Sequence, residues 1–310
     1  MRDVKTICPY CGVGCGMYLV VNDGKVQAVK PQADHPISKG ALCPKGATAH
    51  QFIHREERLS APLVRQGGRL VEVSWDEAYD TIAEGLQRIQ NEHWRDSVAL
   101  ISTTRGSQEE NYVAQKFARA VLATNNLKQC QRICHSATVT GLSEVFGTGA
   151  MSNPVKDFSE PGPKALMVVG SNAAGSHPII WSQWILPTLR KGVPLIVIDP
   201  RRTQVVTEAE KAGAEVLHLH MRPGSDIALF NALCHHILDQ GLHDEAYLAQ
   251  RCENFEAFAA SLERYTPEFA ESLSGVPAAD IRRAAELYAR AKPASITYGI
   301  GVTEHHNGTE

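Results

Sequence analysis

The spacing of apolar residues divides the chain into three stretches. In residues 1 to about 60, an apolar run at 17–21, the turn Asn22-Asp23-Gly24 and a second run at 25–29 predict a β-hairpin. The rest of this stretch is rich in Gly and Pro and contains few large apolar residues. We therefore expect residues 1–60 to form a small β domain.

Residues 61–135 follow a different pattern. A short hairpin is predicted around Gly67-Gly68, and two amphipathic helices are predicted at about 74–89 and 107–122, each opened by a Ser-x-x-Glu capping box. A single strand is expected between them, at 98–101. One strand with two amphipathic helices would leave apolar faces exposed. These residues are therefore predicted to be the first part of an incomplete α/β domain.

Strands and helices alternate from residue 136 to residue 310. A buried strand is predicted at 165–169 and further strands at 194–198, 215–219 and 294–298, with helical segments after 178, at 226–238 and over much of 243–291. This alternation is typical of a doubly wound αβα sandwich, in which ligands bind outside the carboxyl ends of the parallel strands. The predicted fold class is α/β, with the small β domain followed by this sandwich.

Composition and charge narrow the range of functions. The 310 residues include 31 basic and 34 acidic side chains, a formal net charge of -3. This charge gives no large positive field that would attract nucleic acid nonspecifically. The first residues lack a signal-peptide core, and no later run approaches the ~18 apolar residues of a membrane helix. We expect a cytoplasmic protein with no membrane span and no nucleic-acid partner.

Four cysteines near the N-terminus have the spacing of an iron–sulfur site. Cys8, Cys11 and Cys15 are separated by two and then three residues on a Gly-rich loop, and Cys43 follows after 27 more. Thiolates on such a loop can wrap a 4Fe-4S cluster while backbone amides hydrogen-bond its sulfides. A zinc site or unligated thiols are the alternatives, but structural zinc more often uses two separated Cys-x2-Cys hooks. A bound cluster would also supply folding energy to a domain with few apolar residues.

Sequence motifs in all three stretches carry a family resemblance. CPYCGVGCG at 8–16, HPISKGALCPKG at 35–46 and ICHSATVTGLSEVFGTGAMSN at 133–153 closely resemble the catalytic (alpha) subunit of molybdenum- or tungsten-dependent formate dehydrogenases, of the dimethyl sulfoxide reductase-like family. The resemblance continues through GSNAAGSHPI at 170–179 and DPRRT at 199–203. It implies three cofactors: a 4Fe-4S cluster, Mo or W, and molybdopterin guanine dinucleotide, of which the family binds two.

The resemblance also implies an activity, the oxidation of formate to carbon dioxide with two electrons passing through the cluster to a partner. The residue matching Cys134 ligates the metal in this family, and the residue matching His135 lies beside it. A soft thiolate suits the metal, and an imidazole can bind the substrate or accept a proton. Assimilatory nitrate reductases look similar around the cluster but usually lack the histidine. The Cys134-His135 pair therefore favours formate.

Lys45 matches a family lysine that lies between the cluster and one pterin. A cation there would stabilise negative charge along the electron path, whereas the alternative is an ordinary solvated lysine. The resemblance implies that electrons then leave to an iron–sulfur, diaphorase or hydrogenase subunit.

The resemblance assigns the dinucleotide tail to residues that follow the predicted sheet strands. They are Asn172, His177, Asp199, Arg201, Gly224 and Asp226. An Asp can accept hydrogen bonds from guanine, an Arg can reach a phosphate, and a Gly at a helix start leaves room for a pyrophosphate. Alternatively, Asp199 only ends a strand and Asp226 only caps a helix.

Members of this family are much longer, so the resemblance covers their N-terminal half and the fold is expected to be truncated relative to theirs. We expect a C-terminal half or a second chain to complete it. Two alternatives remain: a nitrate reductase-like molybdoenzyme, and a noncatalytic electron-transfer or assembly module. The presence of Cys134, His135 and Lys45 favours the enzyme, since an electron carrier needs none of them.

Overall fold

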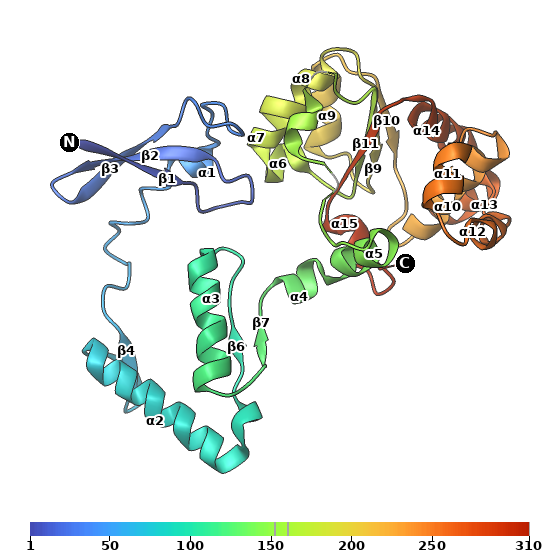
Figure 1. The fold of residues 1–310 in the computed structure, drawn as a ribbon. Helices are drawn as coiled ribbons and strands as arrows, with labels where there is room; N and C mark the ends of the chain where they lie inside the picture. The colour runs from blue at the N-terminus through green and yellow to red at the C-terminus, as the bar shows by residue number, and fades with distance from the viewer. Residues whose placement is uncertain (152, 160, 310) are drawn as a thin grey trace. The chain divides into compact units, whose positions relative to one another are not determined.

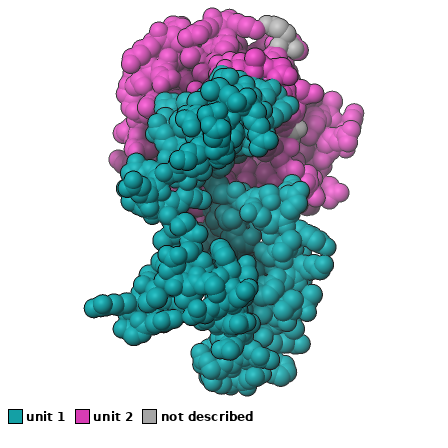
Figure 2. All heavy atoms as spheres, turned by 90° about the vertical axis from the view of Figure 1, so that its left-hand side faces the viewer, with its two compact units in different colours: residues 1–32, 44–134 teal, residues 33–43, 135–310 magenta. Residues whose placement is uncertain are grey.

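The computed structural model describes residues 1–151, 153–159 and 161–309 (Figure 1). Contacts divide the chain into two compact units, residues 1–32 with 44–134 and residues 33–43 with 135–310 (Figure 2). The segment 33–43 therefore belongs to the second unit, although residues of the first unit flank it in sequence. Among the described residues, no helix has both the length and the apolar character needed to cross a bilayer.

The first unit opens with a three-stranded antiparallel sheet. Its strands are β1 (Arg2–Ile7), β2 (Gly16–Asn22) and β3 (Lys25–Pro31), in the order β1-β2-β3. The β2–β3 hairpin confirms the predicted one, and Asp23 and Gly24 take the positive φ angles that its tight turn requires. Strand β1 was not predicted. It pairs with β2 from Arg2↔Val21 to Ile7↔Gly16, so the loop between the two strands carries the three clustered cysteines.

The remainder of the first unit consists of short strands and exposed helices. The elements are α1 (Pro44–Ala47), β4 (Leu63–Gln66), β5 (Arg69–Glu72), α2 (Trp75–His93), η1 (Arg95–Ser97), β6 (Leu100–Ile101), α3 (Gln108–Lys116), η2 (Phe117–Val121), β7 (Leu127–Lys128) and α4 (Gln131–Cys134). The hairpin and both helices confirm the prediction. The strand predicted at 98–101 is only two residues long, and it pairs in parallel with β7.

The two predicted capping boxes differ. Ser107 and Glu110 form a complete box at the start of α3, in which each side chain accepts from the other residue's backbone amide. At the start of α2, Ser74 accepts from the Glu77 amide, but the Glu77 carboxylate accepts from Gln66 Nε2 at 3.3 Å. The second box is therefore only half formed, because the preceding hairpin offers Glu77 another donor.

The second unit contains a four-stranded parallel sheet. Its strands are β8 (Ala165–Val169), β9 (Leu195–Ile198), β10 (Val216–Leu219) and β11 (Ala294–Tyr298), in the order β10-β9-β8-β11. All four agree with the prediction to within one residue. The chain moves outward from β8 through β9 to β10 and returns on the other side of β8 as β11. The order therefore reverses between β8 and β11, and a doubly wound sheet binds its ligand at the carboxyl ends of such strands.

The second unit also contains the helices α5 (Ser136–Phe146), η3 (Val155–Phe158), α6 (Ala173–Ser176), α7 (Pro178–Ile180), η4 (Trp181–Ile185), α8 (Leu186–Leu189), α9 (Gln204–Lys211), α10 (Asp226–Asp239), α11 (Glu245–Arg251), α12 (Phe255–Leu262), α13 (Pro267–Ser274), α14 (Ala278–Arg290) and α15 (Ile300–Thr303). Helices α10, α13 and α14 cover one face of the sheet, and α6, η4, α8 and α9 cover the other. Alternate residues of each strand enter different cores. Met167 and Val169 pack with α10, α13 and α14, whereas Leu166 and Val168 pack with η4, α8 and α9. This arrangement confirms the predicted α/β class.

Candidate functional site

The cysteine loop of the first unit is compact. The Cys8 amide donates to the Cys15 carbonyl at 2.9 Å, and the Gly14 amide donates to the Cys11 carbonyl at 3.2 Å. Cys8 and Cys15 are buried, and Cys11 is half-buried. No three His, Cys, Asp or Glu side chains of the described residues are grouped closely enough to hold one metal ion. A cubane binds each thiolate through a different iron, so the soft donor set and the closed loop fit a cluster.

Cys43, the fourth predicted ligand, ends the segment that belongs to the second unit. The indole Nε1 of Trp184 donates to the Ile37 carbonyl at 2.8 Å, and Lys39 Nζ lies 3.5 Å from the centroid of the Trp184 ring. Trp184 is buried and belongs to the π-helical turn η4. Ser38, which is fully buried, donates its amide to His35 Nδ1. A hydrogen bond and a cation–π contact thus hold the segment that leads to Cys43.

Lys45 follows Cys43 by two residues, lies in the short helix α1 and is exposed. Its carbonyl accepts from Thr48 Oγ1 at 3.5 Å, and this bond continues the helical turn. The structure therefore gives the Lys45 ammonium group a solvent-facing position, and its role beside a pterin stays a prediction.

The predicted metal ligand Cys134 and its neighbour His135 lie where α4 ends and α5 begins. Cys134 is the last residue of α4 and is half-buried, and its amide donates to the Cys130 carbonyl at 2.9 Å. His135 interrupts the helical backbone with φ -135° and ψ 17°, and its side chain is exposed. Cys134 and His135 are therefore not successive residues of one continuous helix.

A hydroxyl relay ties His135 to the carboxyl edge of the sheet. His135 Nδ1 lies 3.1 Å from Thr138 Oγ1, and Thr138 Oγ1 donates to Thr303 Oγ1 at 3.2 Å. Thr303 is buried in α15, directly after β11. Because the Thr138 hydroxyl donates to Thr303, its oxygen is left to accept from a protonated Nδ1. The Nε2 atom of His135 then carries the lone pair, as a general base requires.

Two polar atoms at the carboxyl edge of the sheet are buried without a hydrogen-bond partner among the described residues. They are Asn172 Oδ1, three residues after β8, and Thr203 Oγ1, five residues after β9. The other amide atom of Asn172, Nδ2, donates to Gln204 Oε1 at 3.3 Å. Buried polar atoms are nearly always paired, so two orphans on adjacent strand ends fit a missing polar ligand such as a dinucleotide.

Backbone segments meet closely at the point where the strand order reverses. A Cβ atom added to Gly301 would lie 2.6 Å from the Gly170 carbonyl oxygen, and one added to Gly170 would lie 2.7 Å from the Gly301 carbonyl carbon. Gly170 also has a φ of +52°, which side chains disfavour. Only glycine therefore lets the ends of β8 and β11 meet in this way.

The remaining residues after β8 and β9 have mixed surroundings. Asp199 is buried, and one carboxylate oxygen accepts from the Arg201 amide at 2.8 Å, which closes a local turn. This contact supports the strand-ending role that was the alternative for Asp199. The Arg201 side chain is exposed. His177 lies between α6 and α7, and its Nδ1 is 2.9 Å from Ser176 Oγ.

Gly224 and Asp226 lie at the start of α10. Gly224 has a φ of +83°, and a Cβ there would meet nothing within 4 Å, so the space beside it is open. Asp226 is the first helical residue and not the N-cap, which is Ser225. Burial raises the pKa of the Asp226 carboxyl, and its backbone hydrogen bond and His305, whose Nε2 lies 3.7 Å away, only partly oppose this shift. A half-buried carboxyl beside open space can serve as a hydrogen-bond partner for a ligand.

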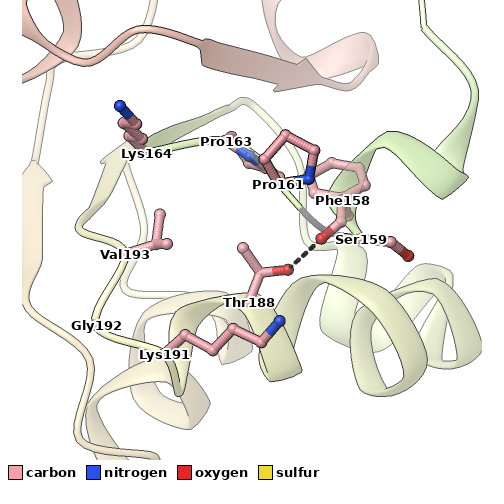
Figure 3. Close-up of a pocket in the computed structure, with 10 residues that line it drawn as sticks. Phe158, Ser159, Pro161, Pro163, Lys164, Thr188, Lys191, Gly192 and Val193 are labelled. Atoms are coloured by element: carbon pink, nitrogen blue, oxygen red, sulfur yellow. Dashed lines mark hydrogen bonds between the residues drawn. The ribbon is translucent and has the colours of Figure 1, made fainter.

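A pocket of about 320 Å³ lies at the opposite end of the sheet, where Lys164 precedes β8 and Val193 precedes β9 (Figure 3). Thr188 Oγ1 donates to the Phe158 carbonyl at 3.0 Å on its wall. Doubly wound sheets bind ligands at their carboxyl ends, so this pocket is on the wrong side for the predicted site.

A closed cysteine loop ahead of a doubly wound sheet, whose carboxyl edge presents unsatisfied polar atoms, defines a redox protein with a cluster domain and a dinucleotide-type domain. Comparison with known proteins gives the same result. Residues 1–55 match the molybdopterin oxidoreductase Fe4S4 domain, and residues 58–310 match molybdopterin oxidoreductase. The chain therefore belongs to the molybdopterin oxidoreductase family. The family matches confirm the resemblance seen in the sequence motifs. They also confirm the predicted cofactors, a 4Fe-4S cluster and a molybdopterin.

The curated relatives are longer than this chain. It is 42% identical over 305 residues to the F420-dependent formate dehydrogenase 1 subunit alpha of Methanococcus maripaludis, covering 98% of this chain and 43% of that protein. It is 40% identical to formate dehydrogenase H of Escherichia coli, covering 100% and 43%. The acetylene hydratase of Pelobacter acetylenicus is structurally similar, with a TM-score of 0.83 and 26% identity, over 97% of this chain and 40% of that one.

Sequence reasoning missed several residues of the edge. Thr203 was inside a motif quoted for the resemblance, yet nothing local marked its hydroxyl as unsatisfied. Gly170 follows the correctly predicted strand β8 by one residue and Gly301 follows β11 by three, so a glycine at a strand end was the available signal. Thr138 and Thr303 are 165 residues apart, and no sequence pattern indicated their contact.

Proposed function

We propose that this chain is the N-terminal part of a formate dehydrogenase catalytic subunit. The Cys134-His135 pair, with its imidazole held by Thr138, is the observation that carries the proposal. The fold alone does not decide between reactions, because a structure of the same fold is named acetylene hydratase. The relatives named formate dehydrogenase, at 40% and 42% identity, support the choice of formate.

In the proposed reaction, formate yields carbon dioxide, one proton and two electrons. A molybdenum or tungsten ion bound through molybdopterin would accept the two electrons, and Cys134 would hold that ion with its thiolate. His135 Nε2 is the proton acceptor, because its other ring nitrogen is occupied by Thr138. Lys45 would stabilise negative charge on the electron path. Cys8, Cys11, Cys15 and Cys43 would hold the 4Fe-4S cluster, which would supply one-electron transfer to a partner.

The dinucleotide is proposed to bind at the carboxyl edge of the sheet. Asn172 and Thr203 would satisfy their buried oxygens on it, and Asp226 would bind it from the start of α10. His177, Asp199, Arg201 and Gly224 are further proposed contacts. The chain spans 43% of these relatives' length, which supports additional polypeptide, either a C-terminal half or a second chain, as a partner. The cytoplasmic location stays a prediction.

Substitution of the proposed metal ligand tests the activity. In the full-length protein, Cys134→Ala should abolish formate-dependent viologen reduction, because the metal loses its protein ligand. The cluster's electron paramagnetic resonance signal should persist, because its four ligands are unchanged. Normal formate activity in this variant would contradict the proposal, as would wild-type protein that reduces nitrate and leaves formate unoxidised.

The hydroxyl relay gives a second test. Thr138→Val keeps the shape of the side chain but removes the oxygen that accepts from His135 Nδ1, so the wrong tautomer becomes accessible. We expect kcat to fall by about 10- to 100-fold, the usual range for losing a group that orients a histidine. Thr138→Ser keeps the oxygen and should retain activity. Equal kinetics for the Val and Ser variants would refute the role of the relay.

A further inference from the structure

One face of the N-terminal sheet combines two lysines with apolar side chains next to the cysteine loop. Lys5 of β1 lies opposite Tyr18 of β2, which lies opposite Lys30 of β3. Ile7 follows Lys5 on the same side of β1, because side chains alternate along a strand. Both lysines and Ile7 are exposed, and Tyr18 is half-buried. We call these four residues the lysine face.

The lysine face leads directly into the proposed cluster ligands. Lys5 precedes Cys8 by three residues and Tyr18 follows Cys15 by three, which is about 10 Å along each strand. Ile7 pairs with Gly16, and the next residue, Cys8, bonds to the Cys15 carbonyl. A protein that covers the lysine face therefore lies beside the loop that would hold the cluster.

The charge of this region differs in sign from that of the whole chain. Residues 1–55 contain seven Lys and Arg against three Asp, a net charge of +4, whereas the complete chain carries -3. One carboxylate lies among the lysines: Asp3 pairs with Lys30 Nζ at 3.1 Å, and both side chains are about half exposed. An exposed pair of this kind contributes little energy, so Lys30 can exchange Asp3 for a carboxylate of a partner.

We propose that the lysine face docks an acidic one-electron carrier protein, which exchanges electrons with the cluster. The proposal rests on the cluster assigned under the proposed function. Lys5 and Lys30 steer the carrier by charge, and Ile7 and Tyr18 supply the apolar contact between them. Each encounter moves one electron between the carrier and the cluster, so one formate requires two encounters and releases one proton.

Charge reversal on the lysine face tests the proposal without formate. Full-length protein with an oxidised cluster is mixed with a reduced acidic 2Fe-2S ferredoxin, and the recovery of ferredoxin absorbance gives the second-order rate of electron transfer. The variant Lys5→Glu/Lys30→Glu should lose about 10- to 100-fold at low ionic strength, because electrostatic steering is worth that much. The difference should shrink at high salt, since a short Debye length screens both charges.

Matched variants distinguish an effect of charge on the lysine face from an effect of the protein's net charge. Lys156→Glu/Lys211→Glu changes the net charge equally at exposed positions of the second unit and should leave the rate within about twofold. Asp3→Asn removes the competing carboxylate and should raise the rate about twofold. Iron content and viologen reduction should match the wild type in all variants.

Equal losses in the two double variants would overturn the proposed docking face, and so would an unchanged rate in Lys5→Glu/Lys30→Glu. A failure of formate oxidation would contradict the proposed function but would leave this measurement intact, because the ferredoxin supplies the electron.

Discussion

Two amphipathic helices, α2 in the first unit and α14 in the second, differ in how far their apolar faces are buried. Ile281 of α14 is 0% exposed in the core under the parallel sheet, whereas Ile82 of α2 is 56% exposed. Trp75 and Tyr79 of α2 contact each other with ring centroids 5.6 Å apart, yet both remain mostly exposed. The sequence pattern thus identifies the apolar face of each helix. Within the described residues, only the face of α14 is covered by packing partners.

That residues 61–135 form the first part of a larger domain stays a prediction, and the exposed apolar faces are the observation that supports it. The apolar face of α2 and α3 also includes Tyr112 and Val113, each more than 60% exposed. Exposed patches of this kind mark surfaces that another polypeptide covers. We expect polypeptide that corresponds to the additional length of the relatives to cover this apolar face.

The largest expected effect on stability comes from truncating a buried side chain in the core of the second unit. Ile281→Ala should lower the free energy of unfolding by about 2–5 kcal/mol, because it removes buried methyl groups and leaves a cavity. Ile82→Ala should change it by no more than about 0.5 kcal/mol in the 310-residue chain. Urea unfolding followed by circular dichroism compares the two. Equal costs would show that α2 is as well packed as α14.

A smaller effect is expected for residues 33–43, which belong to the second unit although they are distant from the rest of it in sequence. Trp184→Leu removes the hydrogen bond to Ile37 and the cation–π contact with Lys39, together about 2 kcal/mol. Trypsin should then cleave after Lys39 at least about tenfold faster, because the segment opens more often.

Trp181→Leu is the matched control for this measurement. Trp181 is also buried in η4, but its indole donates to Glu208. It should lower overall stability without favouring cleavage at Lys39. If both variants exposed Lys39 equally, the segment would not depend on Trp184.

The smallest effect involves a charge at the edge of the filled core. Because burial raises the pKa of Asp226 in the folded protein, its ionisation opposes folding as the pH rises through that raised value. Asp226→Asn should therefore have a higher Tm than the wild type at pH 7, and the difference should vanish below the ordinary value of 3.8. Thermal melts from pH 3 to 8 measure this. A lower Tm at pH 7 would mean that the attraction to His305 outweighs burial.

Local patterns sufficed for much of this fold. The central strands β8 and β9 are continuous apolar runs buried on both faces, and the partly exposed edge strands β10 and β11 are short runs of strand-forming residues, so period and length identified all four. Strand β1 was not predicted because Arg2, Asp3 and Lys5 interrupt its apolar residues. Its pairing with β2 is what makes it a strand.

The site was less accessible to sequence reasoning. The cluster cysteines could be proposed from their spacing, whereas the Cys134-His135 pair was singled out only through the family resemblance. Asn172 was found through the resemblance, but its unsatisfied oxygen depends on how the edge is buried. The contact between Trp184 and Ile37 joins residues 147 apart, which no periodicity reports.

That contact also sets an order of events during synthesis. Residues 33–43 leave the ribosome early, but their binding partner at position 184 is made about 145 residues later. At typical rates of about 5–20 residues per second, the segment waits roughly 7 to 30 s before it can dock. Cys8, Cys11 and Cys15 are available throughout this interval, whereas the segment that ends at Cys43 acquires its native support only afterwards. A cluster inserted into the nascent chain during this interval would therefore bind before the segment that ends at Cys43, the proposed fourth ligand, is anchored.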